Sequence, residues 1–278
     1  MKTKLIMIEG IPGSGKSTFA KRIADFYISH GLKVNLYNEG EFHPADLAWN
    51  ACVPVKSLND VLAPYESFRN EIDKNTHIED DYAIISYTQV KTENAEFYKE
   101  METYEVYDNR VPFDVFNRLH RKRWETFGSQ AKVNNELNIF ECALLQNHVN
   151  ELMLFHLADI DTIKKHINTI IQTVADLSPS LIYLSQPNVK ETIERTAKQR
   201  VSENGRWIDG VINYIENTPY GKLHGIKGFD GAVQIFEERK RIELEIVNSL
   251  PINAIIIENP DYDWDVLWGK IKSFLYIL

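Results

Sequence analysis

The eight residues from Gly10 to Ser17 constrain the fold of this chain more than any other stretch. Their sequence, GIPGSGKS, fits the pattern G-x-x-x-x-G-K-[S/T], in which the backbone N–H groups of a glycine-rich turn surround phosphate oxygens. An apolar run, Leu5–Ile8, precedes the motif as a buried parallel strand would, and a helical pattern, Thr18–His30, follows it. Strand, glycine loop and helix together are the context that the motif requires, so the sequence predicts a nucleoside triphosphate site.

The spacing of this loop assigns a role to its side chains. Lys16 is placed to reach the terminal phosphates, and the Ser17 hydroxyl is placed to bind Mg²⁺. The predicted cofactors are therefore ATP and Mg²⁺. The residues expected to contact the nucleotide are Gly10, Ile11, Pro12, Gly13, Ser14, Gly15, Lys16, Ser17 and Thr18.

Composition limits the partners of the chain. The 278 residues are 44% hydrophobic and 26% charged, which is typical of a soluble globular protein. A net charge of −9 argues against a nucleic acid polymer or an anionic membrane as a partner. No apolar stretch is long enough to span a membrane, and the 2 cysteines lack metal-ligand spacing. We expect a cytoplasmic protein that binds ATP and a small-molecule acceptor, with a homodimer left open.

Short apolar runs alternate with helical patterns over most of the chain, which predicts a three-layer α/β fold with about five parallel strands. The alternation is lost over residues 42–133, a stretch far longer than an ordinary connection. Within a single domain of residues 1–278, we expect this stretch to be a large, mainly helical insertion for substrate or partner binding. Strands are expected at residues 5–8, 33–37, 138–143, 181–184 and 252–257, a helical turn at 46–50, a helix at 143–158 and a loop at 218–231.

The predicted insertion is rich in aromatic rings. These rings either form a stacking pocket for a base or sugar, or they pack a helical insertion against the sheet. The second interpretation is favoured for most of them, because an aromatic stripe at helical spacing is usually part of a core. The rings are Tyr82, Tyr87, Phe97, Tyr98, Tyr104, Tyr107, Phe113, Phe116, Trp124 and Phe127.

Acidic residues follow or end two of the predicted strands. Glu39 and Glu41 come directly after the second strand, where the ligand crevice of an open α/β sheet lies, so either can contact substrate or Mg²⁺. The alternative is a solvated acidic turn. Glu141 lies in an apolar strand, where an unpaired carboxylate is costly, so it is a candidate Mg²⁺ ligand, proton acceptor or both. A salt-bridged carboxylate is the alternative. Gln146, just beyond it, is a further candidate for substrate contact.

Arginines gather around a polar turn after the fourth predicted strand. Arg195, Arg200 and Arg206 flank the sequence SENG, so residues 195–210 are a candidate lid that closes over the transferring phosphate. The alternative is a basic helix end that offsets its own dipole. Residues 258–261, after the last predicted strand, are placed to touch a nucleotide base.

The order of these parts resembles the P-loop kinases of the nucleoside and nucleotide kinase group, such as thymidylate kinase and the deoxynucleoside kinases. The resemblance covers residues 1–41, 137–206 and 252–278, and its specific part is Ile8–Gly10 leading into Gly13–Thr18. In those families an acidic residue near the substrate follows the second strand, as Glu39 does here. Glu141 matches their catalytic carboxylate.

The fourth strand, Leu181–Leu184, with Arg195 and Arg200, resembles the strand and lid helix of those kinases. The chain departs from them after the carboxylate, where Cys142 and Ala143 replace the usual arginine.

The resemblance implies an ATP-dependent phosphotransferase that moves the γ-phosphoryl group to a small molecule, with a nucleoside or nucleotide favoured. Two alternatives stay open: a kinase of another hydroxylated metabolite or antibiotic, and an ATP-binding regulatory protein without a small-molecule acceptor. For a kinase, the expected catalytic set is Lys16, Glu141, Arg195, Arg200 and Arg206.

Overall fold

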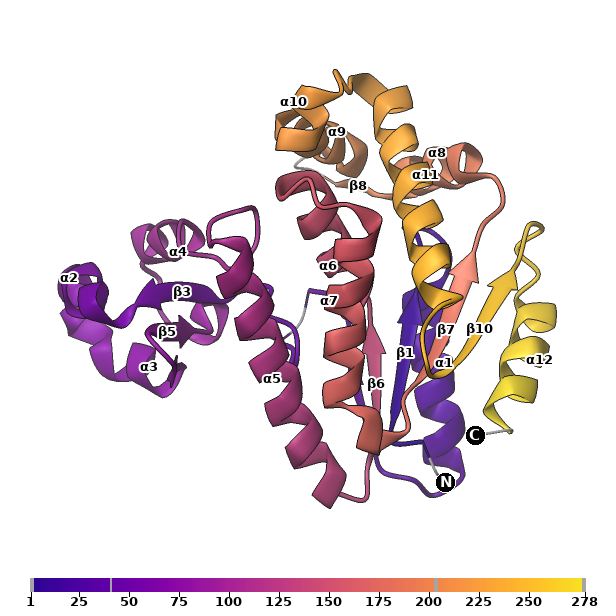
Figure 1. Cartoon of the computed structure of the whole chain (residues 1–278), viewed down its shortest axis with the longest axis horizontal. Helices are drawn as coiled ribbons and strands as arrows, with labels where there is room; N and C mark the ends of the chain where they lie inside the picture. The colour runs from indigo at the N-terminus through magenta and orange to yellow at the C-terminus, as the bar shows by residue number, and fades with distance from the viewer. Residues whose placement is uncertain (1–2, 41, 203–204, 277–278) are drawn as a thin grey trace. The chain divides into compact units, whose positions relative to one another are not determined.

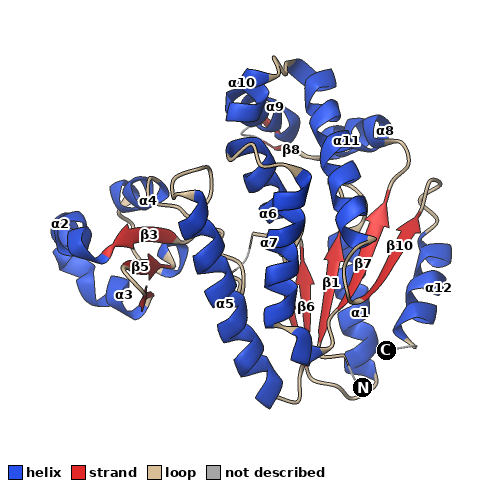
Figure 2. Ribbon diagram, viewed as in Figure 1, coloured by secondary structure: helices blue, strands red, loops and turns tan. Residues whose placement is uncertain are grey.

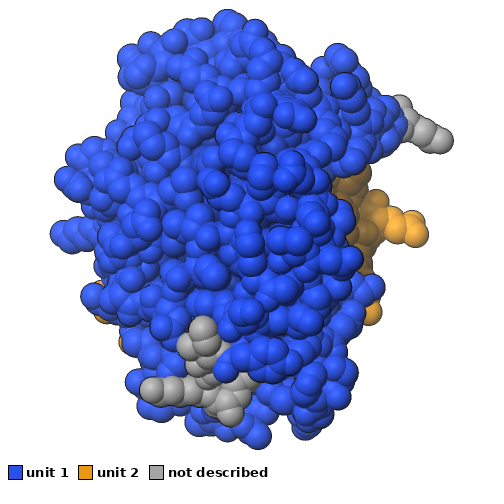
Figure 3. Space-filling view, turned by 90° about the vertical axis from the view of Figure 1, so that its right-hand side faces the viewer, with its two compact units in different colours: residues 1–39, 127–278 blue, residues 40–126 orange. Residues whose placement is uncertain are grey.

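The computed structural model describes residues 3–40, 42–202 and 205–276. The chain divides into two compact units, which are coloured separately in Figure 3. Unit 1 comprises residues 1–39 and 127–278, and unit 2 comprises residues 40–126. In the part of the chain that is described, no helix combines the length and the apolar character needed to cross a membrane.

Unit 1 is built on a sheet of five strands, drawn in red in Figure 2. Their order is β2-β6-β1-β7-β10, and every neighbouring pair is parallel. The predicted α/β class with a parallel sheet of about five strands is therefore confirmed. The strands are β1 (Leu5–Glu9), β2 (Val34–Tyr37), β6 (Leu137–Glu141), β7 (Ser180–Ser185) and β10 (Asn253–Glu258).

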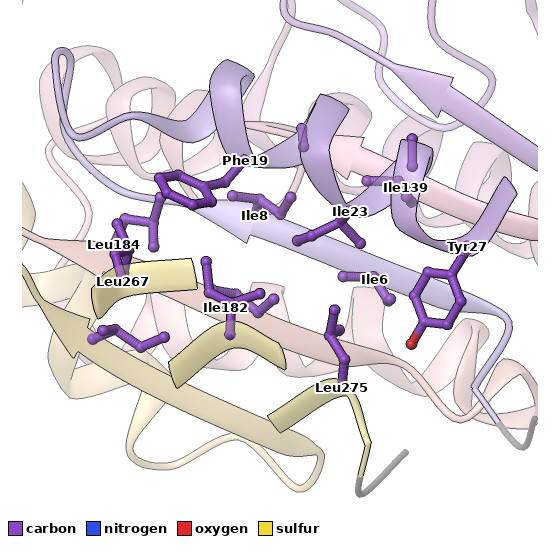
Figure 4. Packing of buried hydrophobic residues seen from close by; sticks show 14 of the residues in the cluster. Ile6, Ile8, Phe19, Ile23, Tyr27, Ile139, Ile182, Leu184, Leu267 and Leu275 are labelled. Carbon is purple, nitrogen blue, oxygen red and sulfur yellow. The ribbon is translucent and has the colours of Figure 1, made fainter. Parts of the chain in front are cut away.

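The three central strands are buried at every residue, which explains their continuous apolar sequences. One face of the sheet is covered by α1 (Lys16–Ser29) and α12 (Trp264–Leu275). Figure 4 shows Ile8 and Ile182 of the sheet packed with Phe19 of α1 and Leu267 of α12.

The other face of the sheet carries α7 (Ile160–Thr173) and α11 (Gly228–Val247), which pass in front of the strands in Figure 1. The hydroxyl of Tyr183 on β7 donates to Glu243 of α11 at 2.6 Å, which ties this helix to the sheet. Unit 1 therefore has the three layers that its sequence pattern predicts.

Shorter elements of unit 1 lie beyond the carboxyl ends of the strands (Figure 1). The expected helix over residues 143–158 is wrong in detail, because α6 is followed by one π-helical turn. The expected loop over residues 218–231 is also wrong. Thr218 caps a short helix there by accepting a hydrogen bond from the Gly221 N–H, and Pro219 suits its first turn. The elements are α6 (Gln146–Asn150), the π-helical turn (Glu151–Phe155), α8 (Val189–Gln199), β8 (Val201–Ser202), β9 (Gly205–Arg206), α9 (Trp207–Asn217) and α10 (Pro219–Leu223).

Unit 2 contains several helices and an antiparallel sheet in the order β3-β5-β4. The helical turn expected at residues 46–50 is wrong: no helix is assigned there, and Trp49 adopts a φ of 61°. Tyr87 and Phe97 are buried, which agrees with packing rather than a stacking pocket, but among the described residues they pack in a core of unit 2 itself and not against the parallel sheet. The elements are β3 (Ala51–Pro54), α2 (Leu58–Leu62), α3 (Arg69–Lys74), β4 (Thr76–Glu79), β5 (Tyr82–Ile85), α4 (Ala95–Glu102) and α5 (Phe113–Val133), in which the unit boundary falls.

Candidate functional site

The loop that joins β1 to α1 is held by close backbone contacts. Gly13 adopts a φ of 82°, and a Cβ at this position would lie 2.0 Å from Thr196 Oγ1 of α8. Gly15 adopts a φ of 97°, and its Cβ would lie 2.6 Å from the Trp264 ring of α12. Both positions therefore require glycine, for conformation and for space. The loop is fixed between two helices that come from the far end of the sequence.

The N-terminus of α1 opens directly from this loop. Gly15 is the N-cap residue, and it provides no side-chain hydrogen bond to the first turn. The initial N–H groups of a helix lack intrahelical partners, and the helix dipole adds positive charge at this end. The loop and the first turn of α1 therefore form a favourable place for a phosphate group.

Lys16 and Ser17 take different positions at this helix start. The Lys16 side chain is buried, and its Nζ donates to the carbonyl oxygen of Ile11 at 3.1 Å, so it lies along the loop. The Ser17 hydroxyl donates to Glu141 Oε1 at 2.5 Å, across to the end of β6. The structure thus brings together the loop and the carboxylate that the sequence singled out.

Three strand ends converge at this edge of the sheet. Glu39, just after β2, donates its backbone N–H to Glu141 Oε2 at 3.4 Å. Ligand atoms of Glu39, Glu141 and Cys142 all lie within 4.8 Å of one another. Cys142 adopts a φ of 65°, an uncommon conformation for a residue other than glycine, as the chain leaves β6. The strand order reverses around β1, which is where ligands bind in open α/β sheets.

The donors at this edge fit a hard divalent cation. Ser17, Glu39 and Glu141 offer hydroxyl and carboxylate oxygens, which Mg²⁺ prefers. Burial raises the pKa of the Cys142 thiol, so it stays protonated and is a poor ligand. The other sequence candidate here, Glu41, lies outside the described residues.

Glu9, at the end of β1, is a buried carboxylate whose contacts the sequence does not reveal. It accepts hydrogen bonds from the backbone N–H groups of residues 144–146, at 2.8, 3.0 and 3.2 Å. The pKa of Glu9 is raised to about 7: burial and nearby Glu243 raise it, and these hydrogen bonds offset part of the increase. Gln146, held by this contact, donates its Nε2 to Glu39 Oε1 at 2.5 Å. Glu9 therefore positions the start of α6 beside the oxygen atoms of Ser17, Glu39 and Glu141 that could bind a cation.

Arg195 faces the loop that follows β10. Its guanidinium carbon lies 3.0 Å from the ring centroid of Tyr262, and the Tyr262 hydroxyl lies 2.8 Å from Thr192 Oγ1. Burial lowers the pKa of Arg195. Thr192 and Arg195 belong to α8, the helix that packs on Gly13, so a flat cationic and aromatic surface lies close to the glycine loop.

The other two arginines of the predicted lid, Arg200 and Arg206, lie in different surroundings. Arg206 is exposed and forms an ion pair with Asp209 at 2.8 Å. Arg200 lies 5.1 Å from the Trp207 ring centroid and lines a cavity. The structure therefore brings Arg200, but not Arg206, to the lining of that cavity.

This cavity has a volume of about 160 Å³. It is lined by Pro12 of the glycine loop, by residues that the sequence predicts to be functional, and by two residues that the sequence does not single out, Asn150 and Arg239. Arg239 and Glu243 lie four residues apart on the buried face of α11. A charged pair among apolar residues is the signal in the sequence that could have indicated Arg239. The polar residues that line the cavity include Glu39, Gln146, Asn150, Arg200 and Arg239.

Comparison with known proteins adds no assignment to this site. No protein-family model and no curated protein matches the chain. The functional inference therefore depends on the geometry of unit 1 and on the sequence motifs.

Proposed function

We propose that this protein is a Mg²⁺-dependent phosphotransferase that moves the γ-phosphoryl group of ATP to a hydroxyl group of a small molecule. The observation that carries the proposal is the 2.5 Å hydrogen bond between Ser17 and Glu141. It joins the start of α1, after a loop with the phosphate-binding motif, to a carboxylate at the ligand-binding edge of the sheet. A hydroxyl, a carboxylate and helix N–H groups in one place are the parts that phosphoryl transfer uses.

In this proposal the loop and Lys16 hold the phosphates. The backbone N–H groups from Gly13 to Ser17 surround the phosphate oxygens, and the Lys16 ammonium moves from the Ile11 carbonyl oxygen to the β- and γ-phosphates. The contact between Arg195 and Tyr262 provides a flat surface near the loop for the adenine base.

Ser17 and Glu141 hold Mg²⁺ with Glu39 beside them. Bound there, the ion offsets the negative charge of the phosphates. The acceptor enters the cavity lined by Glu39, Gln146 and Arg200.

The transfer step moves one phosphoryl group and one proton. The acceptor oxygen attacks the γ-phosphorus, the bond from that phosphorus to the β-phosphate bridging oxygen breaks, and ADP leaves. The acceptor hydroxyl loses its proton to a carboxylate, for which Glu141 is the candidate. Arg200 stabilises the charge on the transferring group.

Three further assignments belong to this proposal. The sheet of unit 1 is that of a P-loop NTPase, and unit 2 is an insertion after its second strand. The resemblance to nucleoside and nucleotide kinases favours a nucleoside or nucleotide as acceptor. ATP as the donor and two buried free cysteines, Cys52 and Cys142, agree with a cytoplasmic location.

ATP binding tests the role of the loop. Lys16→Ala should weaken the binding of Mg·ATP by about a hundredfold, because a charge-assisted contact with the phosphates is lost. The matched control is Lys21→Ala, which removes an exposed lysine on the same helix and should leave the affinity unchanged. The measurement is isothermal titration calorimetry, and equal affinities for the two variants would exclude the proposed loop contact.

Glu141→Gln tests the carboxylate. It keeps the size of the side chain and removes its charge, so transfer should slow by about a hundredfold or more while ATP still binds. The control Glu136→Gln lies just before β6, at the opposite end of this strand. A Mg²⁺ titration separates the two roles: a variant rescued by excess Mg²⁺ identifies a cation ligand, and one that stays slow identifies the proton acceptor. Full activity in Glu141→Gln would remove Glu141 from both roles.

A further inference from the structure

The cavity beside the glycine loop is lined by buried polar groups and apolar side chains. The buried polar groups are Arg239, of which 2% is exposed, and Gln146, of which 6% is exposed. Its walls include Leu154, Val211 and Phe236. A small apolar space with a few convergent polar groups is the usual form of a ligand site.

Arg239 is only partly satisfied by its neighbours. Its Nε lies 3.1 Å from Glu243 Oε1, and its Nη1 donates to Asn150 Oδ1 at 3.4 Å. Its Nη2 is buried and has no hydrogen-bond partner within residues 3–40, 42–202 and 205–276. A buried guanidinium N–H group without a partner is costly, and its planar fork suits a carboxylate or a phosphate.

The charges around the cavity also favour a negatively charged group at its arginine end. Arg200 and Arg239 are the cationic residues in the described lining, and Glu39 is the acidic one. Glu39 accepts a hydrogen bond from the Gln146 Nε2 at 2.5 Å, and it is one of the residues whose oxygens could bind a cation. Because Glu243 pairs with the Nε side of Arg239, the groups that remain to receive an anion are Arg200 and the Nη2 group of Arg239.

Gln146 is the other buried polar residue in the cavity lining. Its Oε1 is buried and has no hydrogen-bond partner in the described chain, so it can accept a hydrogen bond from a ligand hydroxyl. Asn150, which contacts Arg239, follows Gln146 by four residues on α6. Four residues of helix span about 6 Å along the axis. The hydroxyl end and the anion end of the site are thus about one helical turn apart.

We infer that the acceptor is a small hydroxylated molecule that carries an oxyanion, with an apolar body between the two groups. The oxyanion binds Arg239 and Arg200, and the hydroxyl lies at Gln146, next to Glu39 and the phosphates. This inference rests on the proposed function only for the claim that the bound molecule accepts the phosphoryl group. The binding of such a molecule does not depend on that function. An uncharged oxygen could accept a hydrogen bond from the Arg239 Nη2, but it would lack the charge-assisted, bidentate contact that an oxyanion makes with a guanidinium.

Matched probes test the anion. The probes are 4-(hydroxymethyl)benzoate, 4-(hydroxymethyl)phenyl phosphate and the uncharged 4-(hydroxymethyl)benzamide, with binding measured by calorimetry in the presence of Mg·ADP and in its absence. We expect the carboxylate or the phosphate to bind about tenfold or more tightly than the amide. The better of the two anions identifies which oxyanion the site prefers. Equal binding of amide and anions, or no binding of any probe at millimolar concentration, would overturn the inference.

Variants locate the bound anion. The double variant Arg239→Gln/Glu243→Gln removes both charges of the buried pair and keeps hydrogen-bonding groups for the Tyr183 hydroxyl. It should lose the preference for anions, whereas Arg241→Gln, an exposed position on the same helix, should keep it. A double variant that unfolds by circular dichroism is replaced by a cavity-filling change.

Val211→Phe is that change, because it fills the apolar wall and leaves the arginines in place. It should abolish the binding of the anionic probes, and Val266→Phe, at an exposed valine on α12, should not. Anion preference retained in Val211→Phe would place the site elsewhere and overturn the inference.

The two claims fail in distinguishable ways. If Mg·ATP binds and supports transfer but the amide binds as well as the anions, the inference fails and the proposed function stands. If the anions bind preferentially but Mg·ATP does not bind, the proposed function fails and the anion site stands.

Discussion

Gly13 shows how closely a single residue is constrained in this protein. Its φ of 82° and the 2.0 Å separation between a Cβ and Thr196 Oγ1 leave no room for a side chain. The conformation alone costs a residue other than glycine about 1–2 kcal/mol. The contact with α8 adds to this cost, because the threonine hydroxyl already donates to the Thr192 carbonyl oxygen.

Gly13→Ala should therefore weaken Mg·ATP binding by about tenfold or more, because the strained φ and the clash with Thr196 displace the loop and its N–H groups. Calorimetric titration with Mg·ATP and a thermal melt measure the two effects. Gly210→Ala, at an open position on α9, is the control and should raise stability by up to about 1 kcal/mol. Unchanged ATP affinity in Gly13→Ala would mean that the loop does not hold the nucleotide in this conformation.

Glu9 predicts a pH dependence of stability. Its pKa of about 7 in the folded state lies above the ordinary value of 4.5, because burial disfavours the charge. The folded state thus holds a proton that the unfolded state releases, so this contribution is present at low pH and is lost as the pH rises through 7. Between pH 5 and pH 8 the loss should be roughly 2 to 3 kcal/mol.

Urea unfolding of the wild type and of Glu9→Gln at both pH values measures this loss. The difference between the two free energies of unfolding isolates Glu9 from the other titrating groups. The wild type should lose stability relative to Glu9→Gln as the pH rises. A difference that stays constant from pH 5 to pH 8 would show that Glu9 does not titrate in this range.

At the scale of elements, α8 links the stability of the fold to the loop. Its N-cap residue, Asn188, accepts a hydrogen bond from the Glu191 N–H at 3.0 Å, and its Thr196 packs on Gly13. Asp159 caps α7 in the same way, by accepting from the Thr162 N–H at 2.8 Å. The two helices are capped in the same way, but of these two helices only α8 contacts Gly13 among the described residues.

Replacing either cap residue by alanine should lower stability by about 1 kcal/mol. Only Asn188→Ala should also weaken Mg·ATP binding, because fraying of α8 releases the loop. Denaturant unfolding and calorimetry on the same preparations separate the two effects. Equal ATP affinity in Asn188→Ala and Asp159→Ala would contradict a role of α8 in holding the loop.

The elements also show which parts of the structure a sequence can reveal. The strands β1, β6 and β7 are buried throughout, so their apolar runs predict them and place Glu141 at a strand end. The strands of unit 2 have four residues each, and β4 contains Thr76, His77 and Glu79, so no apolar run marks that strand. The five-residue helix α10 is equally short for a periodic signal.

The candidate site divides in the same way. Ser17 and Glu141 were predictable because a motif and a buried carboxylate are local signals, and the parallel sheet brings them together. Arg239 and Tyr262 were not, because their contacts depend on how α11 and the loop after β10 meet distant helices. Such long-range packing leaves only a weak trace in the sequence, such as a charged pair on an apolar stripe.

At the level of the whole molecule, the proposed activity, phosphoryl transfer, belongs to unit 1. The helices that cover its sheet, the strand ends that carry carboxylates, and the cavity with its arginines all belong to this unit. A regulatory protein would use the same loop to bind ATP but would need no acceptor cavity. Transfer to an acceptor is therefore the property that distinguishes the two classes of function.

The most direct measurement is ADP release from Mg·ATP in the presence of pooled nucleosides, nucleoside monophosphates, small hydroxylated acids and aminoglycoside-type compounds. We expect one pool to accelerate ADP release, a phosphorylated product of that pool to accumulate in equal amount, and Lys16→Ala to abolish both. Tight binding of Mg·ATP with no acceleration by any pool, and no phosphorylated product, would contradict this expectation and favour a regulatory role for the bound nucleotide.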